Sequence, residues 1–270
     1  MAVIEAFFLP GSQGARFAIY HPPAAGVAER GGVLYVPPFA EEMNKARRMV
    51  ALQARRLAVA GFGVLIPDLY GCGDSAGDFA EARWEIWRDD LSRCRDWLLG
   101  RGHHRLVLWG LRLGALLAAE LAGDSTTQRL LLWQPVLDGE RFLHQFLRLR
   151  LTADRLKGGD ETMARLQEVL AAGQTLEVSG YELSPELATA MKQARLQVPP
   201  AGGWVDWFEL VNAVNRPLLP ASQRTVDEWR TSGVTIHPRT LVGEAFWATQ
   251  EIATAPDLLA ATVAALVAER

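Results

Sequence analysis

Arg112 stands between Gly110 and Gly114, where an apolar run that predicts a strand meets an alanine-rich run that predicts a helix. Small residues two places before and two places after a central residue allow a sharp turn that lifts the central side chain above a sheet. A serine in that place can attack a carbonyl group, but a guanidinium stays protonated at physiological pH and is no nucleophile. The spacing therefore predicts a nucleophile-type turn that carries a permanent positive charge.

A positive charge at this turn suits the binding of an anion. We expect Arg112 at the amino end of a helix over residues 113–122, where unpaired N–H groups and the helix dipole attract negative charge. A guanidinium adds two-pronged hydrogen bonding to a carboxylate or a phosphate. Two alternatives stay open: Arg112 binds an anionic ligand, or it pairs internally with Glu41 or Glu42 on the neighbouring loop.

The front half of the chain supplies the elements that position this turn. Strands are predicted at residues 4–9, 16–20, 33–36, 63–66, 106–109 and 130–133, and helices at 43–60, 84–98 and 113–122. This alternation is typical of a mostly parallel, doubly wound α/β sheet. Ligands of such sheets gather at the carboxyl ends of the strands, which is where Arg112 is expected.

The pattern changes over residues 139–200, which are helical, charged and rich in arginine, with one strand predicted at 176–178. We interpret this segment as a helical cap inserted into a single domain of residues 1–270. The main fold then resumes with a strand at 204–211, a helix around 225–232, a strand at 234–236 and a last helix from residue 257.

Several motifs occur in the order in which α/β-hydrolases carry them. Residues 33–40 match the strand and oxyanion loop of that superfamily, and Gly110 and Gly114 match its elbow. Its Asp-x-x-Gly-x-Gly-x-Ser pattern is matched by Asp68, Gly71, Gly73 and Ser75. The chain thus resembles the α/β-hydrolase superfamily over nearly its whole length, which implies the α/β-hydrolase fold. Residues 38–45 and 109–114 resemble more closely the exosortase A system-associated hydrolase 2 family, from bacterial gene sets for protein sorting and exopolysaccharide production.

The same resemblance implies a histidine after the last strand and an acid after the strand at 204–211. Ala245 stands where the histidine is expected, and Asn212 and Asn215 follow the other strand. Hydrolysis by a Ser-His-acid triad needs a hydroxyl, an imidazole and a carboxylate that orients the imidazole. With Arg112 in the place of the serine, the sequence predicts that this triad is lost.

Two other side chains could substitute for the missing groups. Cys72, in a loop rich in glycine, could act as a displaced nucleophile, although a small apolar filler is the commoner role of such a cysteine. His237, beside Pro238 at the end of the strand predicted at 234–236, could act as a base. The histidines lack metal-binding spacing, and no dinucleotide or phosphate-loop motif occurs, so neither a metal nor a cofactor is predicted.

The composition narrows the possible partners. The 270 residues are 49% hydrophobic and 22% charged, which is typical of a globular protein, and the net charge is −3. This charge, without runs of one sign, argues against nucleic acid as a partner. The amino end lacks the basic region of a signal peptide, and the longest apolar run, residues 258–268, is too short to span a bilayer. We expect a cytoplasmic protein, and its oligomeric state stays open.

Two functions follow as hypotheses. In the first, a hydrolase-fold protein without a triad binds a small anionic or acyl ligand, or a partner. The residues expected to contact that ligand are Phe39, Ala40, Glu41, Glu42, Arg112 and Leu113. In the second, an unconventional hydrolase cleaves an ester, thioester or glycosidic bond by general acid–base chemistry or thiolate attack, using Glu41, Glu42, Cys72 or His237.

Overall fold

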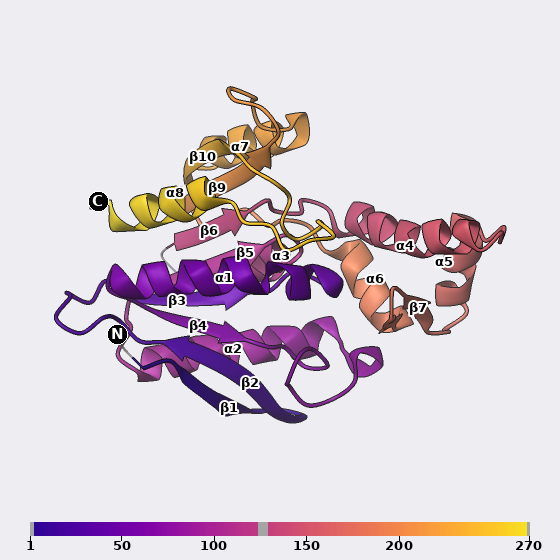
Figure 1. Ribbon diagram of the computed structural model, residues 1–270, viewed down its shortest axis with the longest axis horizontal. Helices are drawn as coiled ribbons and strands as arrows, with labels where there is room; N and C mark the ends of the chain where they lie inside the picture. Colours follow the sequence, from indigo (N-terminus) through magenta and orange to yellow (C-terminus); the bar gives the residue numbers. More distant parts are fainter. Residues whose placement is uncertain (1–2, 124–128, 269–270) are drawn as a thin grey trace.

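A single eight-stranded sheet forms the centre of the protein. The computed structural model describes residues 3–123 and 129–268. The strands lie in the order β1-β2-β4-β3-β5-β6-β9-β10 (Figure 1). They are β1 (Glu5–Gly11), β2 (Gly14–His21), β3 (Gly31–Val36), β4 (Phe62–Pro67), β5 (Leu106–Leu111), β6 (Arg129–Trp133), β9 (Trp204–Val211) and β10 (Thr235–Val242).

The sheet is parallel from β4 to β10, and only the pairs β1–β2 and β2–β4 are antiparallel. Every residue of β3 and of β5 is buried, as expected of strands that are covered on both faces. The prediction of a mostly parallel, doubly wound sheet is confirmed. The strand order and the placement of the helices are those of the α/β-hydrolase fold.

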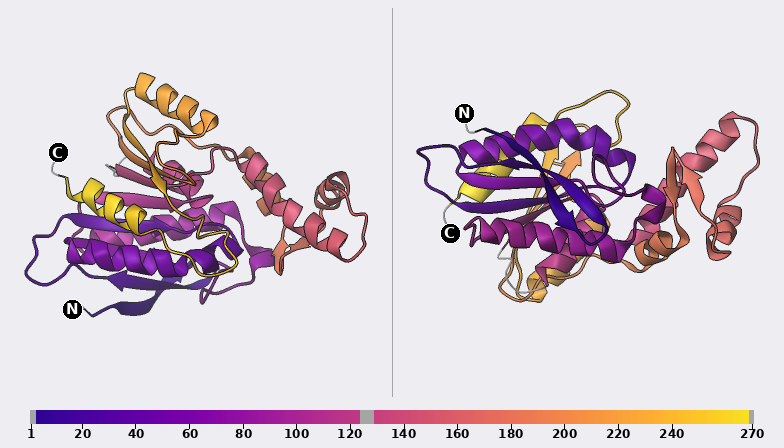
Figure 2. Two further views of the ribbon diagram at one scale, coloured as in Figure 1. Left: turned by 45° about the horizontal axis from the view of Figure 1, so that its top comes forward. Right: turned by 90° about the horizontal axis from the view of Figure 1, so that it is seen from below.

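Helices cover both faces of the sheet and create two apolar layers. One layer lies beneath α1 and α8, and the other lies beneath α2, α3 and α7 (Figure 2). The helices are α1 (Glu41–Val59), the short 3-10 helix η1 (Phe79–Glu81), α2 (Trp84–Gly100), α3 (Gly114–Ala122), α7 (Pro220–Thr231) and α8 (Pro256–Val267). None of the helices in the described ranges is long and apolar enough to cross a membrane.

A separate group of elements projects from the sheet on the right of Figure 1. Its members are α4 (Gly139–Leu156), α5 (Met163–Ala171), β7 (Leu176–Val178), β8 (Tyr181–Leu183) and α6 (Pro185–Gln193), with β7 and β8 paired antiparallel. We call this group the lobe. It is tied to the sheet body by hydrogen bonds from Asn44 Nδ2 to Tyr181 Oη at 3.0 Å and from Arg83 Nη1 to Ser184 Oγ at 3.1 Å.

Two sequence-based boundaries were wrong, and one strand was missed. The strand expected to end at residue 236 continues to Val242 and passes through Pro238. β10 is the last strand of the sheet, and a proline without an N–H is tolerated on such an edge. The helix expected around 225–232 begins at Pro220, since a proline fits the first turn of a helix. The short strand β8 was not predicted, because its few residues show no clear alternation.

Candidate functional site

The turn between β5 and α3 has the backbone geometry expected of a nucleophile elbow. Arg112 has a φ of 54°, in the left-handed region that residues other than glycine adopt rarely and at a cost in free energy. Its N–H donates to the Trp133 carbonyl, and its own carbonyl accepts from the N–H groups of Ala115 and Val136, each at 3.1 Å. Backbone hydrogen bonds on both sides therefore hold this strained turn.

The two glycines of the turn are required by close packing. A Cβ atom at Gly110 would lie 2.6 Å from the Cα atom of Ala115. A Cβ atom at Gly114 would lie 2.5 Å from the carbonyl oxygen of Pro37 and would also overlap the carbonyl oxygen of Val36. Neither position has space for a side chain. Glycine at both positions therefore allows the start of α3 to pack closely against the end of β3.

The guanidinium of Arg112 forms an internal ion pair. Its Nε donates to Glu42 Oε1 at 3.2 Å, and the two side chains are 17% and 16% exposed. Glu41, the other candidate partner, pairs instead with Lys45 at 3.2 Å. The guanidinium carbon also lies 5.4 Å from the centroid of the Trp247 indole, within the range of a cation–π interaction. Of the two alternatives, the structure thus contains the pair with Glu42, and the ligand-binding role of Arg112 stays a prediction.

Glu42 lies in the first turn of α1 and is only partly satisfied by Arg112. Its second carboxylate oxygen, Oε2, is buried without a hydrogen-bond partner in the described part of the chain. Burial raises the pKa of Glu42 above its ordinary value of 4.5, and the charge of Arg112 opposes that rise. The carboxyl beside the elbow is therefore easier to protonate than a solvated glutamate.

Aromatic side chains fill the space beside the elbow. Phe39 packs edge-on against four rings at centroid distances between 4.9 and 6.1 Å. These rings belong to Phe79, Trp87, Phe142 and Phe146, and we call the five residues the aromatic cluster. Phe142 also stands 5.7 Å from the guanidinium carbon of Arg112, so the cluster reaches the elbow from the lobe.

Three of the residues expected to contact a ligand are buried in the protein itself. Phe39 is 3% exposed, Ala40 4% and Leu113 2%. Ala40 precedes α1 with a φ of 52°, which makes it a second strained backbone position. A ligand at the elbow would therefore meet Arg112, with Glu41 and Glu42 partly exposed beside it, before it met these three residues.

The positions expected for the histidine and the acid lie in loops at the same end of the sheet. Ala245 is exposed in the segment that follows β10, and it offers no titratable group. Asn212 and Asn215 are exposed in the segment that follows β9. The contact between this region and the elbow is made by Trp247, two residues after Ala245.

Two polar residues near these loops were missed by the sequence analysis. Glu209, inside β9 and 2% exposed, accepts from Trp207 Nε1 at 3.1 Å and from the Leu219 N–H at 3.2 Å. Gln134 follows β6 with a φ of 43°, and its Oε1 accepts from the Leu210 N–H at 2.8 Å. The sequence signal for Glu209 was an acidic residue inside a strand that is apolar apart from Asp206 and Glu209.

A cavity of about 890 Å³ lies at this edge of the sheet, and we call it the edge groove. It is bounded by the ends of β9 and β10 and by the loops that follow them. Arg112 does not line it, but Trp247 does and so separates the groove from the elbow. Its lining includes Gln134, Glu209, Val211, Leu218, Val242 and Trp247.

Neither proposed substitute nucleophile or base meets Arg112. Burial, with the nearby charge of Asp68, raises the pKa of the Cys72 thiol to about 12, so the reactive thiolate is scarce at neutral pH. His237 was expected at the end of the last strand, but β10 continues to Val242. His237 therefore lies in the first half of β10, opposite Asp206 of β9. Its ring stacks on Trp204 at a centroid distance of 4.6 Å, toward the amino ends of the strands and away from the elbow.

Hydrogen bonds of Asp68 and Ser75 explain the shape of the glycine-containing loop after β4. The carboxylate of Asp68 accepts from Arg47 at 3.2 Å and from the Asp74 N–H at 3.1 Å, and its carbonyl accepts from Ser75 Oγ at 2.6 Å. These bonds close the loop on itself. Within the described residues, no group of three or more His, Cys, Asp or Glu side chains could hold a metal ion.

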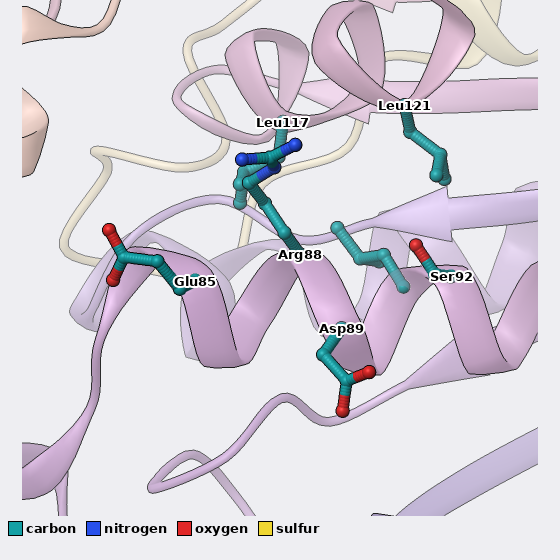
Figure 3. Close-up of a pocket in the computed structure, with 7 residues that line it drawn as sticks. Glu85, Arg88, Asp89, Ser92, Leu117 and Leu121 are labelled. Carbon is teal, nitrogen blue, oxygen red and sulfur yellow. The ribbon is translucent and has the colours of Figure 1, made fainter. Parts of the chain in front are cut away.

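A smaller cavity of about 230 Å³ lies between α2 and α3. Figure 3 shows Arg88 reaching from α2 toward Leu117 of α3, with the carboxylates of Glu85 and Asp89 turned away from it. Arg88 also pairs with Glu120 at 3.3 Å. These contacts join two helices on one face of the sheet and bring no group to the elbow.

Comparisons with known proteins agree on the fold. No protein-family model matches the sequence, and no curated protein matches it. Est1E from Butyrivibrio proteoclasticus, solved with ferulic acid bound, is 13% identical, with a TM-score of 0.65 over 97% of this chain and 96% of that one. The α/β hydrolase GrgF from Penicillium sp. sh18 is 14% identical, with a TM-score of 0.63 over 98% of each chain.

A further solved structure is an α/β serine hydrolase without a lid from Xanthomonas campestris. It is 17% identical, with a TM-score of 0.57 over 98% of this chain and 93% of that one. At these identities the likeness concerns the fold alone. The chain is therefore similar to α/β hydrolases in its whole architecture, and its chemistry has to be argued from its own side chains.

Proposed function

We propose that this hydrolase-fold protein has lost the Ser-His-acid triad and that Arg112 binds an anionic ligand, or an acidic group of a partner, at the elbow. The observation that carries the proposal is the guanidinium in the place of the attacking hydroxyl, on a backbone held at a φ of 54°. Ala245 and the asparagines after β9 supply no imidazole and no carboxylate for a triad.

The contacts of Arg112 leave donors for such a ligand. Within the described ranges it donates to Glu42 through Nε, and no protein acceptor takes a hydrogen bond from its two Nη groups. The Arg112 side chain is 17% exposed and lies next to the amino end of α3, where the helix dipole favours negative charge. Two Nη groups suit the two oxygens of a carboxylate, or two of the four oxygens of a sulfate.

Glu42 sets the condition for binding. An ionised Glu42 neutralises Arg112 and repels an incoming anion, whereas a protonated Glu42 does neither. Because its pKa is raised, protonation begins at a higher pH than for a solvated glutamate. Anion affinity should therefore increase as the pH falls through the range in which Glu42 takes up its proton.

Sulfate is a suitable probe, because it keeps its double charge over that pH range. We expect sodium sulfate to raise the thermal unfolding temperature more than sodium chloride of equal ionic strength, and by more at low pH. Sulfate also stabilises folded proteins generally, by exclusion from their surfaces, so Arg112→Met should reduce the difference and remove its dependence on pH. Arg88→Met, which removes an arginine between α2 and α3, should preserve both. Equal stabilisation of the protein and of its Arg112→Met variant would overturn the proposal.

Hydrolysis is tested on the same preparations. We expect no turnover of short-chain p-nitrophenyl esters or of thioesters above the level given by Arg112→Met. Turnover that survives purification and disappears in Glu42→Gln or Cys72→Ala would instead support an unconventional hydrolase. Glu42 is the residue for which that alternative has a structural argument, since a raised pKa suits a general acid or base.

The biological setting is also a proposal. The resemblance of residues 38–45 and 109–114 to the exosortase A system-associated hydrolase 2 family supports a cytoplasmic role in a bacterial gene set for protein sorting or exopolysaccharide production. Deletion of the gene in its host should then reduce surface exopolysaccharide. Complementation with the Arg112→Met variant should fail if the elbow carries that role.

A further inference from the structure

We propose that the edge groove is a second binding site, and that its ligand is an amphipathic amine: an ammonium group on an apolar body. The argument begins at Glu209, a residue that lines the groove and is 2% exposed. Both of its oxygens accept hydrogen bonds from neutral donors, Trp207 Nε1 and the Leu219 N–H. Among the residues that the structure describes, no cation forms an ion pair with it.

A buried carboxylate without a cation is costly, because two neutral hydrogen bonds replace only part of the lost hydration. An ammonium group in the groove would supply the missing charge, and each carboxylate oxygen has a further lone pair to accept from it. The charged residues at the rim, Arg216 and Glu244, are both exposed and have opposite signs, so water screens them and their effects oppose each other. The buried charge therefore decides which ligand is favoured.

The walls of the groove determine the rest of the ligand. Val211, Leu218, Val242 and Trp247 contribute apolar side chains to the lining of the groove. The volume of about 890 Å³ is in the range of pockets that hold small organic molecules. A short aliphatic or aromatic body attached to the ammonium group would bury its apolar surface against these side chains.

The backbone around the groove is fixed in advance. Gln134 keeps a φ of 43° at the end of β6, a strained conformation of the kind that gathers at ligand sites. Its N–H donates to the Phe208 carbonyl at 2.7 Å and its Oε1 accepts from the Leu210 N–H, so it holds the end of β9. On the other side, the bond from the Leu219 N–H to Glu209 anchors the loop before α7. The carboxylate thus stays in place when a ligand enters.

Three probes that differ only in their head group test the proposal: 2-phenylethylamine, 2-phenylethanol and phenylacetate. Isothermal titration should detect the amine at concentrations up to about 10 mM, with at least about tenfold weaker binding of the alcohol and the acid. Glu209→Gln should weaken binding of the amine by about tenfold or more, and Glu244→Gln at the exposed rim should change it little.

A second variant keeps the test decisive if Glu209→Gln does not fold. Val242→Trp fills the groove from an exposed strand end and leaves the carboxylate untouched, and it should also abolish binding of the amine. Arg88→Met, between α2 and α3 and outside the lining of the groove, should leave that binding unchanged. Equal binding of the three probes, binding unaffected by Val242→Trp, or no binding of the amine would each overturn the proposal.

Discussion

Glu42 offers Arg112 only one of its two carboxylate oxygens. Oε1 accepts from the guanidinium at 3.2 Å, whereas Oε2 is buried without a hydrogen-bond partner in the described part of the chain. The pair joins the first turn of α1 to the elbow, two segments that are 70 residues apart in the sequence. The Glu42 carboxylate is therefore both paired and poorly solvated, and these two effects shift its pKa in opposite directions.

The stability of the protein should depend on pH through Glu42. In the folded state its pKa lies above the ordinary 4.5, because burial outweighs the attraction of Arg112. Between 4.5 and the raised value, the folded state holds a proton that the unfolded state has released, so the free energy of unfolding falls as the pH rises through this window. Urea unfolding over this window should show a smaller fall in Glu42→Gln.

The effect of Glu42 is the difference in the free energy of unfolding between the protein and its Glu42→Gln variant, followed over pH. Asp90 and Glu120 also have pKa values raised by burial and contribute a fall of the same sign in both proteins. If Glu42 instead made the free energy of unfolding rise with pH, the ion pair with Arg112, and not burial, would dominate the pKa of Glu42.

A hydroxyl restored at the elbow should not restore hydrolysis. Arg112→Ser puts an oxygen in the place of the guanidinium, but Ala245 provides no imidazole to take its proton. The variant also leaves Glu42 unpaired at neutral pH, which we expect to cost about 2 kcal/mol of stability, discounted from a fully buried pair for its partial exposure. Esterase assays and urea unfolding measure both effects, and turnover well above that of Arg112→Met would contradict the first.

The close packing of Gly114 gives a prediction with a matched control. Gly114→Ala should destabilise the protein by about 3 kcal/mol, because the new Cβ would overlap two backbone carbonyls that cannot move independently. Gly100→Ala, at an exposed helical position with nothing within 4 Å of the new atom, should instead stabilise it by about 0.5 kcal/mol. Similar effects of the two changes would show that the elbow has more space than the structure indicates.

Cys72 should be nearly unreactive in the folded protein. With its pKa raised to about 12, only about one thiol in ten thousand is ionised near pH 8. A Cys94→Ala background isolates Cys72, and its alkylation by iodoacetamide should be slow until urea unfolds the chain. Rapid alkylation of the native variant would revive the displaced-nucleophile hypothesis.

Most of the fold could be predicted from local patterns. The strand at 204–211 has the bounds of β9, and the run at 106–109 lies within β5, because buried parallel strands are recognisable as short apolar runs. The error at β10 arose because Pro238 normally ends a strand, and the sequence does not reveal that this strand lies at the sheet edge. Edge position is a property of the assembled sheet.

The candidate site was less predictable than the fold. The glycine spacing placed Arg112 on the correct turn, because steric requirements act between near neighbours in the chain. Whether Glu41 or Glu42 would meet it depended on the rotation of α1, and the contact with Trp247 depended on a loop 135 residues away. Glu209 escaped notice because its partners come from its own strand and from the α7 loop, which no local pattern relates.

The hydrogen-bonded turn at residue 112 has a practical consequence. Trp133, Ala115 and Val136 fix the backbone there through main-chain atoms alone, so the direction in which residue 112 leaves the chain does not depend on its type. A spin label attached through Arg112→Cys, paired with a second label on the lobe, would report the separation of the sheet body and the lobe from a rigid, known starting point. Measured from that point, any opening of the lobe would be read as a distance.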